Sequence, residues 1–397
     1  MRVLTIHNHY QQLGGEDTIF ATESDLLESY GHDVYRHTIH NDDLEDMSAI
    51  DLAAATLWNR KSFQKLKSVI EEFRPDVAHF HNTFPLISPA AYYAAQESGV
   101  PVIQTLHNYR LLCPNGLFFR DGRVCEDCLG KPMPWPGIVH GCYRGSRVAS
   151  GAVATMVNLH SLMGTWAKAV DIFIAYSQFA LDKFIEGGIP KDKFEFKTNF
   201  LHPAPEVGKG KGGFGLFVGR LSTEKGLDTL LAAWEKLHTK VPLKIVGAGP
   251  LASEVEAAAK RFDSVEYLGR RPLSEVYDLM GEAKFFVFPS KWYETFGRVA
   301  IEAYAKGTPI LASRIGAITE LVKPYETGLL FEPGDANDLV TQVEWVLNHP
   351  DDWQKIRKQA RQEFEACYTA SLNYKRLMEI YQKAIALKSP TKSPAAA

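Results

Sequence analysis

Four charged side chains in the second half of the chain have the types and the spacing to hold an anionic, hydroxyl-rich ligand. Glu294 and Glu302 lie eight residues apart in the segment ETFGRVAIE, and Arg220 and Lys225 lie five residues apart further upstream. An arginine binds phosphate oxygens in a bidentate manner, a lysine supplies a mobile point charge, and a carboxylate accepts hydrogen bonds from two neighbouring hydroxyls. Cations for phosphates beside acids for hydroxyls predict a nucleotide-sugar site.

The two cations follow an apolar run at 214–218 and precede a helical pattern that begins near Leu227. At a junction between a strand and a helix, loop amides and the positive end of the helix add to the charge of Arg220 and Lys225. The alternative is ordinary surface charge on a loop. The strand–loop–helix setting favours an anion-binding function.

The two acids need a different interpretation. If a helix begins near Thr295 and includes Glu302, an offset of eight residues is roughly 12 Å of rise. That separation is too large for an acid/base couple that acts on one bond. It suits Glu294 and Glu302 holding opposite ends of an extended diphosphate ligand, with two helix-surface acids as the alternative.

Two glycine-containing turns also follow apolar runs. Gly14 and Gly15 follow the first run, and Gly249 lies in the turn GAGP at 247–250. Glycines in such turns let the backbone approach a phosphate or sugar closely, although plain structural turns are the alternative. Neither turn has the G-x-G-x-x-G spacing, so we expect no nicotinamide or flavin cofactor. His107 ends a predicted strand at 102–107, the end at which open α/β sheets bind ligands.

Four of the five cysteines lie within 30 residues, at Cys113, Cys125, Cys128 and Cys142. The C-x2-C pair with two flanking thiols fits a tetrahedral Zn²⁺ site, and we expect one structural zinc there. Two disulfides or four unbridged thiols are the alternatives, the disulfides being disfavoured in a cytosolic protein.

The elements that position these residues alternate along the chain, which predicts an α/β fold with parallel sheets. We expect strands at 3–7, 33–36, 76–81, 102–107, 172–175, 194–198, 214–218, 243–246, 265–268, 285–288 and 309–312. We expect helices at 18–29, 89–96, 150–169, 180–186, 227–237, 251–261, 273–280 and 296–306, followed by a wholly helical region after residue 350.

Length and composition predict two domains. A chain of 397 residues is too long for one ordinary α/β domain, and the Pro/Gly/Lys-rich segment 203–213 suits a linker. We expect an N-terminal domain at 1–203 and a C-terminal domain at 204–369. A helix at about 370–388 should pack back on the first domain, and 389–397 should be a disordered tail.

Charge and hydropathy exclude several classes. The formal net charge is −3 and no Lys/Arg-rich run occurs, which argues against a nucleic-acid binder. No stretch is apolar enough to span a membrane, and the start lacks a cleavable signal, so we expect a cytoplasmic protein. Peripheral contact with the inner face of a membrane stays open, because Arg144 and Arg147 precede an apolar helical pattern. An ordinary core helix is the alternative for that segment.

These motifs resemble those of the retaining glycosyltransferases of glycosyltransferase family 4 (glycosyl transferases group 1), over nearly the whole chain. The most specific match is E-x7-E at Glu294 and Glu302, preceded by FPS at 288–290. Supporting matches lie at 219–226, 246–250, 268–269 and 14–16. The resemblance implies a GT-B fold, with two Rossmann-like, doubly wound parallel-sheet domains facing across a cleft and C-terminal helices.

The resemblance also implies roles for the domains and for single residues. The domain at 1–203 would bind the acceptor, and the domain at 204–369 would bind the nucleotide-sugar donor. Arg220 and Lys225 would hold the diphosphate, Glu294 would lie beside the donor sugar, Glu302 would hold the ribose, and His107 would line the transfer site. We expect further substrate contacts from Ser290, Phe296, Gly297, Gly14, Gly15 and Gly249. Many relatives carry His-Asp where this chain has His107-Asn108, so Asn108 receives no carboxylate role.

We therefore expect a metal-independent, retaining hexosyltransferase that moves a sugar from a UDP- or GDP-sugar to an acceptor hydroxyl. The acceptor would be a carbohydrate or a lipid-linked sugar in polysaccharide or glycolipid assembly, with no cofactor for catalysis. A non-catalytic nucleotide-sugar-binding partner of a polysaccharide assembly complex is the alternative. A phosphorylase would normally be larger, and an epimerase has no obvious use for the E-x7-E arrangement.

Overall fold

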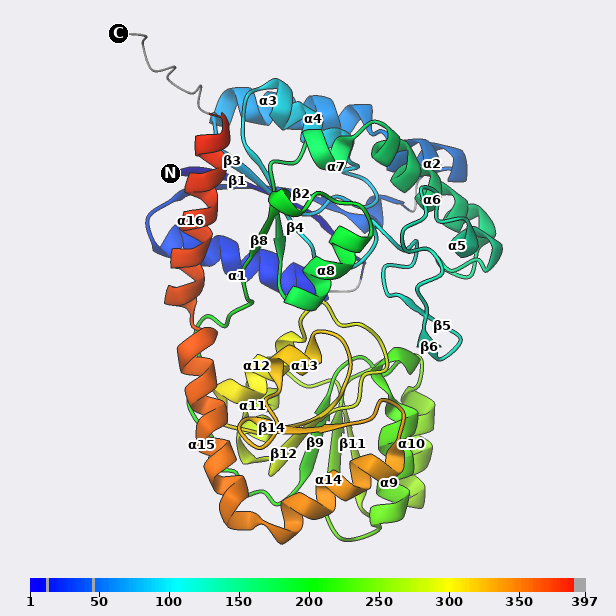
Figure 1. Ribbon diagram of the computed structural model, residues 1–397, viewed down its shortest axis with the longest axis vertical. Helices are drawn as coiled ribbons and strands as arrows, with labels where there is room; N and C mark the ends of the chain where they lie inside the picture. Colours follow the sequence, from blue (N-terminus) through cyan, green and yellow to red (C-terminus); the bar gives the residue numbers. More distant parts are fainter. Residues whose placement is uncertain (12–13, 45–46, 389–397) are drawn as a thin grey trace. The chain divides into compact units, whose positions relative to one another are not determined.

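The computed structural model describes residues 1–11, 14–44 and 47–388, and the chain forms two compact units (Figure 1). The first unit comprises Met1–Gly116, Glu126–Lys197 and the segment that begins at Asn373. The second unit comprises Leu117–Cys125 and Thr198–Leu372. The division after Lys197 lies a few residues before the expected boundary at 203, and 117–125 groups with the second unit rather than the first.

The first unit is built on a six-stranded parallel sheet in the order β2-β1-β3-β4-β7-β8. The strands are β1 (Arg2–His9), β2 (Asp33–His40), β3 (Val77–Asn82), β4 (Val102–Thr105), β7 (Ile172–Ala175) and β8 (Phe194–Phe196). The order of connection reverses between β1 and β3. In open parallel sheets, ligands bind outside the carboxyl ends of the strands at such a switch point.

Helices cover both faces of this sheet. They are α1 (Gly15–Ser29), α2 (Ala49–Leu57), α3 (Arg60–Phe73), α4 (Ala90–Glu97), α5 (Trp135–Val139), α6 (Arg147–Leu162), α7 (Thr165–Lys168), α8 (Gln178–Glu186) and α16 (Ala370–Lys388). Figure 1 shows α3 and α4 on one side of the sheet and α1 on the other. Short 3-10 helices lie at Asn41–Leu44 and Lys191–Lys193.

The alternation of side chains along β1 and β3 decides which residues face α1. Val3 and Val77 pack in one buried cluster with Leu27 of α1 and Leu377 of α16. Because neighbouring side chains on a strand point to opposite faces, other odd-numbered residues of these strands lie on the same side. The ring of Phe80 instead meets Tyr92 of α4 at 4.8 Å between centroids.

The second unit has its own six-stranded parallel sheet, in the order β11-β10-β9-β12-β13-β14. The strands are β9 (Gly215–Val218), β10 (Leu243–Val246), β11 (Val265–Gly269), β12 (Phe285–Phe288), β13 (Ile310–Ser313) and β14 (Gly328–Phe331). Numbered within the unit this is 3-2-1-4-5-6, the order of doubly wound dinucleotide-binding folds. Its switch point lies between β9 and β12.

The helices of the second unit cover the sheet and enclose a core around Trp234 and Phe285. They are α9 (Leu227–Leu237), α10 (Ala252–Arg261), α11 (Leu273–Glu282), α12 (Arg298–Ala305), α13 (Ile318–Leu321), α14 (Ala336–Asn348) and α15 (Pro350–Cys367), with a 3-10 turn, η3, at Thr223–Lys225. A short hairpin, β5 (Phe119–Arg120) with β6 (Arg123–Val124), belongs to the same unit.

The predicted fold class, with two parallel-sheet domains surrounded by helices, is confirmed. Three local expectations were wrong. The predicted helix at 150–169 is two helices, because Gly164 adopts a left-handed conformation between α6 and α7. The strand predicted at 102–107 ends at Thr105, so His107 lies in the loop beyond it. Helix α12 begins at Arg298 rather than near Thr295, so the 12 Å rise does not describe the two acids. The expected tail at 389–397 lies outside the described residues.

Candidate functional site

In the second unit, the loops after β9 and β12 meet at the switch point of the sheet. Gly226 ends η3 with a φ of +70°, and a Cβ on it would lie 1.9 Å from the carbonyl oxygen of Pro289. The backbone amide of Lys291 also donates to the carbonyl of Glu224 at 2.8 Å. These contacts fix Lys225 in the first loop against the second loop.

Lys225 and Glu294 form the centre of this site. The ammonium of Lys225 lies 2.5 Å from Oε1 of Glu294. The same oxygen accepts hydrogen bonds from the hydroxyl of Ser290 and the indole nitrogen of Trp292, each at 2.9 Å. Lys225 also lies over the Trp292 ring, 5.2 Å from its centroid. Three donors therefore converge on one carboxylate oxygen of a buried side chain, and Lys225 keeps 22% of its surface exposed.

Glu302 has a different partner. It lies in the second turn of α12, where Arg298 Nε is 3.6 Å from its Oε1. Burial raises the pKa of the Glu302 carboxyl, and the Arg298 guanidinium opposes that shift. Burial together with the nearby Glu302 also raises the pKa of Tyr277 to about 12. The two acids of the E-x7-E motif thus have separate cationic neighbours.

The other residues predicted in this unit surround the same loops. Arg220 is exposed beyond the end of β9. Gly297 caps α12 with a φ of +97°, and Phe296 is buried against Tyr368. A Cβ on Gly249 would lie 2.4 Å from the carbonyl oxygen of Leu221. Close packing against Leu221 therefore explains why a glycine occupies this position.

In the first unit, Gly14 and Gly15 begin α1 beside the carboxyl end of β1. The amide of Gly14 donates to Oδ2 of Asp17 at 2.7 Å, as in a capping box. Asp17 also accepts hydrogen bonds at its other oxygen, which fix the first turn of the helix. The two glycines therefore lie at the start of an ordered helix, at the switch point of the first sheet.

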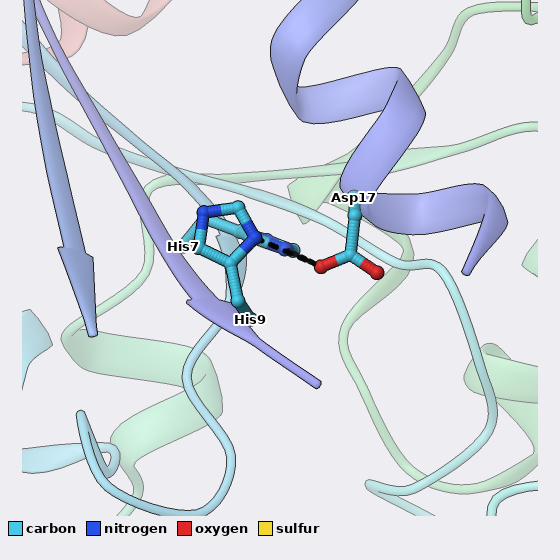
Figure 2. Close-up of side chains that lie close together, drawn as sticks. All are labelled: His7, His9 and Asp17. Atoms are coloured by element: carbon cyan, nitrogen blue, oxygen red, sulfur yellow. Dashed lines mark hydrogen bonds and ion pairs between the residues drawn. The ribbon is translucent and has the colours of Figure 1, made fainter. Parts of the chain in front are cut away.

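Two histidines of β1 meet Asp17 (Figure 2). His7 Nε2 lies 2.9 Å and His9 Nδ1 3.0 Å from the same oxygen, Oδ1 of Asp17. Burial lowers the pKa of His7, whereas the hydrogen bonds from His7, Gly14 and His9 outweigh burial and lower the pKa of Asp17 to about 2. At neutral pH this cluster holds a neutral His7 imidazole and an ionised carboxylate.

A second group of buried polar side chains follows on β3. His79 Nδ1 lies 3.3 Å and His81 Nε2 3.5 Å from Oε1 of Glu23 on α1. The other Glu23 oxygen accepts from the ammonium of Lys197 at 2.6 Å. Burial lowers the pKa of His79 to about 4 despite the opposing effect of Glu23. His79 is also hydrogen-bonded to Tyr381 of α16, at 2.8 Å, which ties that helix to the sheet.

His107 joins this histidine group. Its Nε2 lies 3.1 Å from Nδ1 of His81. Desolvation, followed by the nearby imidazoles of His7 and His79, holds the pKa of His107 well below 6.5. His107 is therefore a neutral hydrogen-bonding group at neutral pH rather than a cation.

Asn108, which follows His107, donates to Oε2 of Glu16 at 3.3 Å. The pKa of Glu16 is raised to about 7, chiefly because the carboxyl group is desolvated. Its Oε1 is buried. Glu16 was not among the residues predicted for the site, although its place directly after Gly14-Gly15 was a usable signal.

The cysteines have the following surroundings. Cys113 and Cys128 are buried, and Cys125 and Cys142 are partly exposed. The thiol of Cys113 lies 3.0 Å from Oδ1 of Asn115, and that of Cys128 lies 3.8 Å from the carbonyl of Pro134. In the described part of the chain, two groups of side chains bring three potential ligand atoms close enough together to hold a metal ion. Neither group contains a cysteine. The structural zinc stays a prediction.

The sequence thus predicted the loops and His107, but not His7, His9, His79 and His81. The signal was present, because H-x-H occurs at the ends of two strands, at His7–His9 and His79–His81. Side chains two apart on a strand share a face, so each pair points to the same helix.

Within the described residues, no helix combines the length and apolar character needed to cross a membrane.

Comparison with protein families assigns both halves of the chain. The family model described as Glycosyltransferase Family 4 matches residues 1–201, and the one described as Glycosyl transferases group 1 matches residues 203–363.

Curated relatives match with moderate identity. A protein described as an uncharacterised 42.6 kDa protein in the cps region of Klebsiella pneumoniae is 29% identical over 274 residues, which is 67% of this chain and 64% of that protein. A sulfoquinovosyl transferase of Arabidopsis thaliana is 26% identical over 309 residues, 76% of this chain and 55% of that protein. A glycogen synthase of Mycobacterium tuberculosis is 27% identical over 362 residues, 86% of this chain and 76% of that protein. The matched region thus spans less than two thirds of the first two of these relatives.

Solved structures share the fold. Anabaena HepE in complex with UDP has a TM-score of 0.68 at 18% identity, covering 96% of this chain and 100% of HepE. Sucrose-phosphate synthase of Thermosynechococcus elongatus has a TM-score of 0.72 at 18% identity, covering 97% and 99% of the two chains. At this identity the likeness shows the fold, which is that of GT-B glycosyltransferases.

Proposed function

The chain belongs to Glycosyltransferase Family 4, and we propose that it transfers a hexose from a UDP- or GDP-sugar to an acceptor hydroxyl with retention at the anomeric carbon. The observation that carries this proposal is the Lys225–Glu294 pair at the switch point of the second sheet. An ordered cation there, together with the exposed Arg220 on the same loop, suits a diphosphate. HepE, which shares the fold, binds UDP and UDP-glucose, and this supports the same class of ligand.

In this proposal, Arg220 and Lys225 stabilise the charge that develops on the leaving diphosphate. The bond between the anomeric carbon and the phosphate oxygen breaks, and its electron pair stays with the diphosphate. The acceptor oxygen bonds to the same face of the anomeric carbon and passes its proton to the leaving phosphate oxygen. The two cations supply the charge neutralisation, so the proposed transfer needs no divalent metal.

The remaining site residues bind and orient. Glu302 would accept hydrogen bonds from the ribose hydroxyls, and Glu294 would lie beside the donor sugar. In the first unit, His107 would offer a neutral imidazole to a sugar hydroxyl. Gly14 and Gly15 would let the backbone at the start of α1 approach the ligand closely.

We further propose a lipid-linked acceptor, because α6 carries an uncharged exposed face. Val148 and Leu162 are 82% and 77% exposed, and Leu159 lies between them on the same face at helical spacing. Arg144 and Arg147, both exposed, lie at the start of this helix. An apolar face bordered by arginines suits an anionic membrane surface.

The test of the transfer proposal is a hydrolysis screen without acceptor. The purified chain is incubated with a panel of UDP- and GDP-sugars, and released nucleoside diphosphate is measured alongside the Lys225→Ala variant. We expect slow hydrolysis of one donor, with the anomer of the freshly released sugar retained in an NMR spectrum. Binding of a nucleotide-sugar with no hydrolysis, and no transfer to any added acceptor, would favour a non-catalytic partner of an assembly complex.

A further inference from the structure

We propose that His7, His9 and Asp17 form a binding site for a divalent transition-metal cation at the carboxyl end of β1. The three side chains come from two elements that meet here, the end of a strand and the first turn of the helix that follows it. Figure 2 shows both imidazoles directed at the same carboxylate. The inference does not depend on the proposed transfer reaction.

The three potential ligand atoms already lie close together. Nε2 of His7 and Nδ1 of His9 lie 2.9 Å and 3.0 Å from one oxygen of Asp17, and the three ligand atoms all lie within 4.8 Å of one another. A tetrahedral ion with bonds of 2.0–2.1 Å separates its ligands by about 3.3 Å, so small side-chain movements suffice. Without metal, both imidazoles present N–H groups to the carboxylate. With metal, the protons move to the other ring nitrogens, and the cation would lie between the two freed ring nitrogens and the carboxylate oxygen of Asp17.

The ligand chemistry selects the class of cation. Two imidazoles and one carboxylate suit zinc and its transition-metal neighbours, whereas magnesium and calcium prefer oxygen ligands. Three protein ligands leave at least one coordination position for water or for an anionic group of a ligand. His7 and Asp17 are buried, but His9 keeps 24% of its side chain exposed, which gives an ion a route to the site.

The second histidine group of the unit is a poorer candidate. Glu23, His79 and His81 also bring three ligand atoms within 4.8 Å of one another. However, the Lys197 ammonium lies 2.6 Å from Glu23, and all four side chains are buried. A second cation there would meet the charge of Lys197 at short range in a poorly screened interior.

The site also has a physical consequence for the β1–α1 connection. Asp17 holds the amide of Gly14 through its other oxygen at 2.7 Å. A bound cation would therefore link the end of β1, the first turn of α1 and the glycine that begins the helix. Its effect would be to rigidify the segment in which Gly14 and Gly15 lie.

The experiment measures metal binding rather than activity. The full chain, stripped with a chelator, is titrated with Zn²⁺ and Co²⁺ by calorimetry and by visible absorption, with Mg²⁺ as the comparison ion. Co²⁺ bound by thiolates gives charge-transfer absorption that histidine and aspartate ligands do not give, which separates this site from any cysteine site. When Cys125 and Cys128 are changed to serine, we expect saturable Co²⁺ binding without thiolate charge-transfer absorption, and no saturable Mg²⁺ binding.

Two ligand variants and one control decide the outcome. Loss of an outer-shell partner typically lowers metal affinity by about 10–100-fold. His9→Ala and Asp17→Asn each remove a direct ligand and should lower the affinity for Co²⁺ and Zn²⁺ by more than that. With Cys125 and Cys128 changed to serine, thermal unfolding should also shift upward with Zn²⁺, and adding His9→Ala to that variant should abolish the shift. His40→Ala, which removes an imidazole stacked on His9 at 5.9 Å, should bind as the wild type does. Unchanged binding in both ligand variants, no thiolate-free Co²⁺ signal, or an equal loss in His40→Ala would overturn the proposal.

Discussion

Lys225 and Glu294 form an ion pair of 2.5 Å that joins the loop after β9 to the loop after β12. The two acids of the E-x7-E motif therefore differ in their cationic partners. Glu294 pairs with a lysine from another loop, whereas Glu302 lies beside Arg298, four residues earlier on the same helix. The side chain of Lys225 is only 22% exposed. A diphosphate that binds Lys225 must therefore share the ammonium with Glu294.

Lys225→Ala and Arg220→Ala should each lower turnover by about 10²–10³-fold, as expected for loss of one preorganised charge donor. The two variants should differ in stability. Lys225→Ala leaves the buried Glu294 without its cation and should cost about 1–3 kcal/mol of unfolding free energy. Arg220→Ala should leave the unfolding free energy little changed, because Arg220 is exposed. Steady-state kinetics and urea unfolding of both variants measure these effects.

Lys240→Ala is the matched control for this experiment. Lys240 pairs with Glu344 in an exposed ion pair of the same unit, and such pairs contribute little. Near-normal turnover in both site variants, or a loss in Lys240→Ala as large as theirs, would remove the diphosphate assignment.

The two glutamates should separate in nucleotide binding. Glu302→Gln should weaken binding of free nucleoside diphosphate by about 10-fold or more, since hydrogen bonds to a charged group are worth about 1.5–3 kcal/mol. Glu294→Gln should slow transfer but leave that binding equal or tighter, because it frees Lys225 for the phosphates. Calorimetry with the nucleotide alone tests this, and equal weakening by both variants would contradict the split.

The exposed face of α6 should decide membrane contact. Leu159→Glu combined with Leu162→Glu places two acids in the apolar face and should abolish co-sedimentation with phosphatidylglycerol-containing vesicles. Leu387→Glu is the control, because Leu387 is 59% exposed on a different helix, α16. If the double variant sediments with vesicles as well as the wild type, the face of α6 does not bind the membrane.

The sequence predicted strands well where apolar residues run without interruption. The expected bounds at 172–175, 243–246 and 285–288 are those of β7, β10 and β12, because buried strands of parallel sheets consist of such runs. Helix ends were harder. Hydrophobic periodicity continued across Gly164, where only the backbone conformation ends α6. Likewise, Gly297 delays the start of α12 beyond the expected position.

The candidate site was predictable in its residue types but not in its pairings. The cations and acids were recognised from motifs, but the partner of Glu294 lies 69 residues away in sequence, so no local spacing reveals it. The histidine cluster depends on three strands and α1 meeting at one switch point. That arrangement follows from sheet order, which a single sequence does not specify.

Acid should destabilise the chain through its buried histidines. The pKa of His79 is lowered to about 4 from 6.5, so between these pH values the unfolded state binds a proton that the folded state does not. The stability contribution is therefore present above pH 6.5 and lost as the pH falls to about 4, at up to about 1.4 kcal/mol per pH unit. His79→Gln keeps hydrogen-bonding capacity and removes the titration, so the slope of unfolding free energy against pH should fall by about one proton. The same slope in His79→Gln and the wild type would show that His79 is not the titrating group.

The four clustered cysteines should bind one structural zinc. Thiols at this spacing match tetrahedral zinc sites, and a zinc there would fix the irregular segment that follows His107. Protein purified without chelator should therefore lose about one zinc per chain when Cys125 and Cys128 are both changed to serine. His9→Ala, which leaves these thiols intact, should retain that zinc.

The role of this zinc should be structural rather than chemical, because Arg220 and Lys225 already supply the charge for the proposed transfer. Sugar transfer by the assembled protein should accordingly survive EDTA added during the assay, while thermal stability falls after prolonged chelation. Equal zinc content in the wild type and the double serine variant, with thiols that react freely in the folded protein, would show that the cysteines bind no metal. Sulfurs unreactive until a reductant is added would instead establish disulfides.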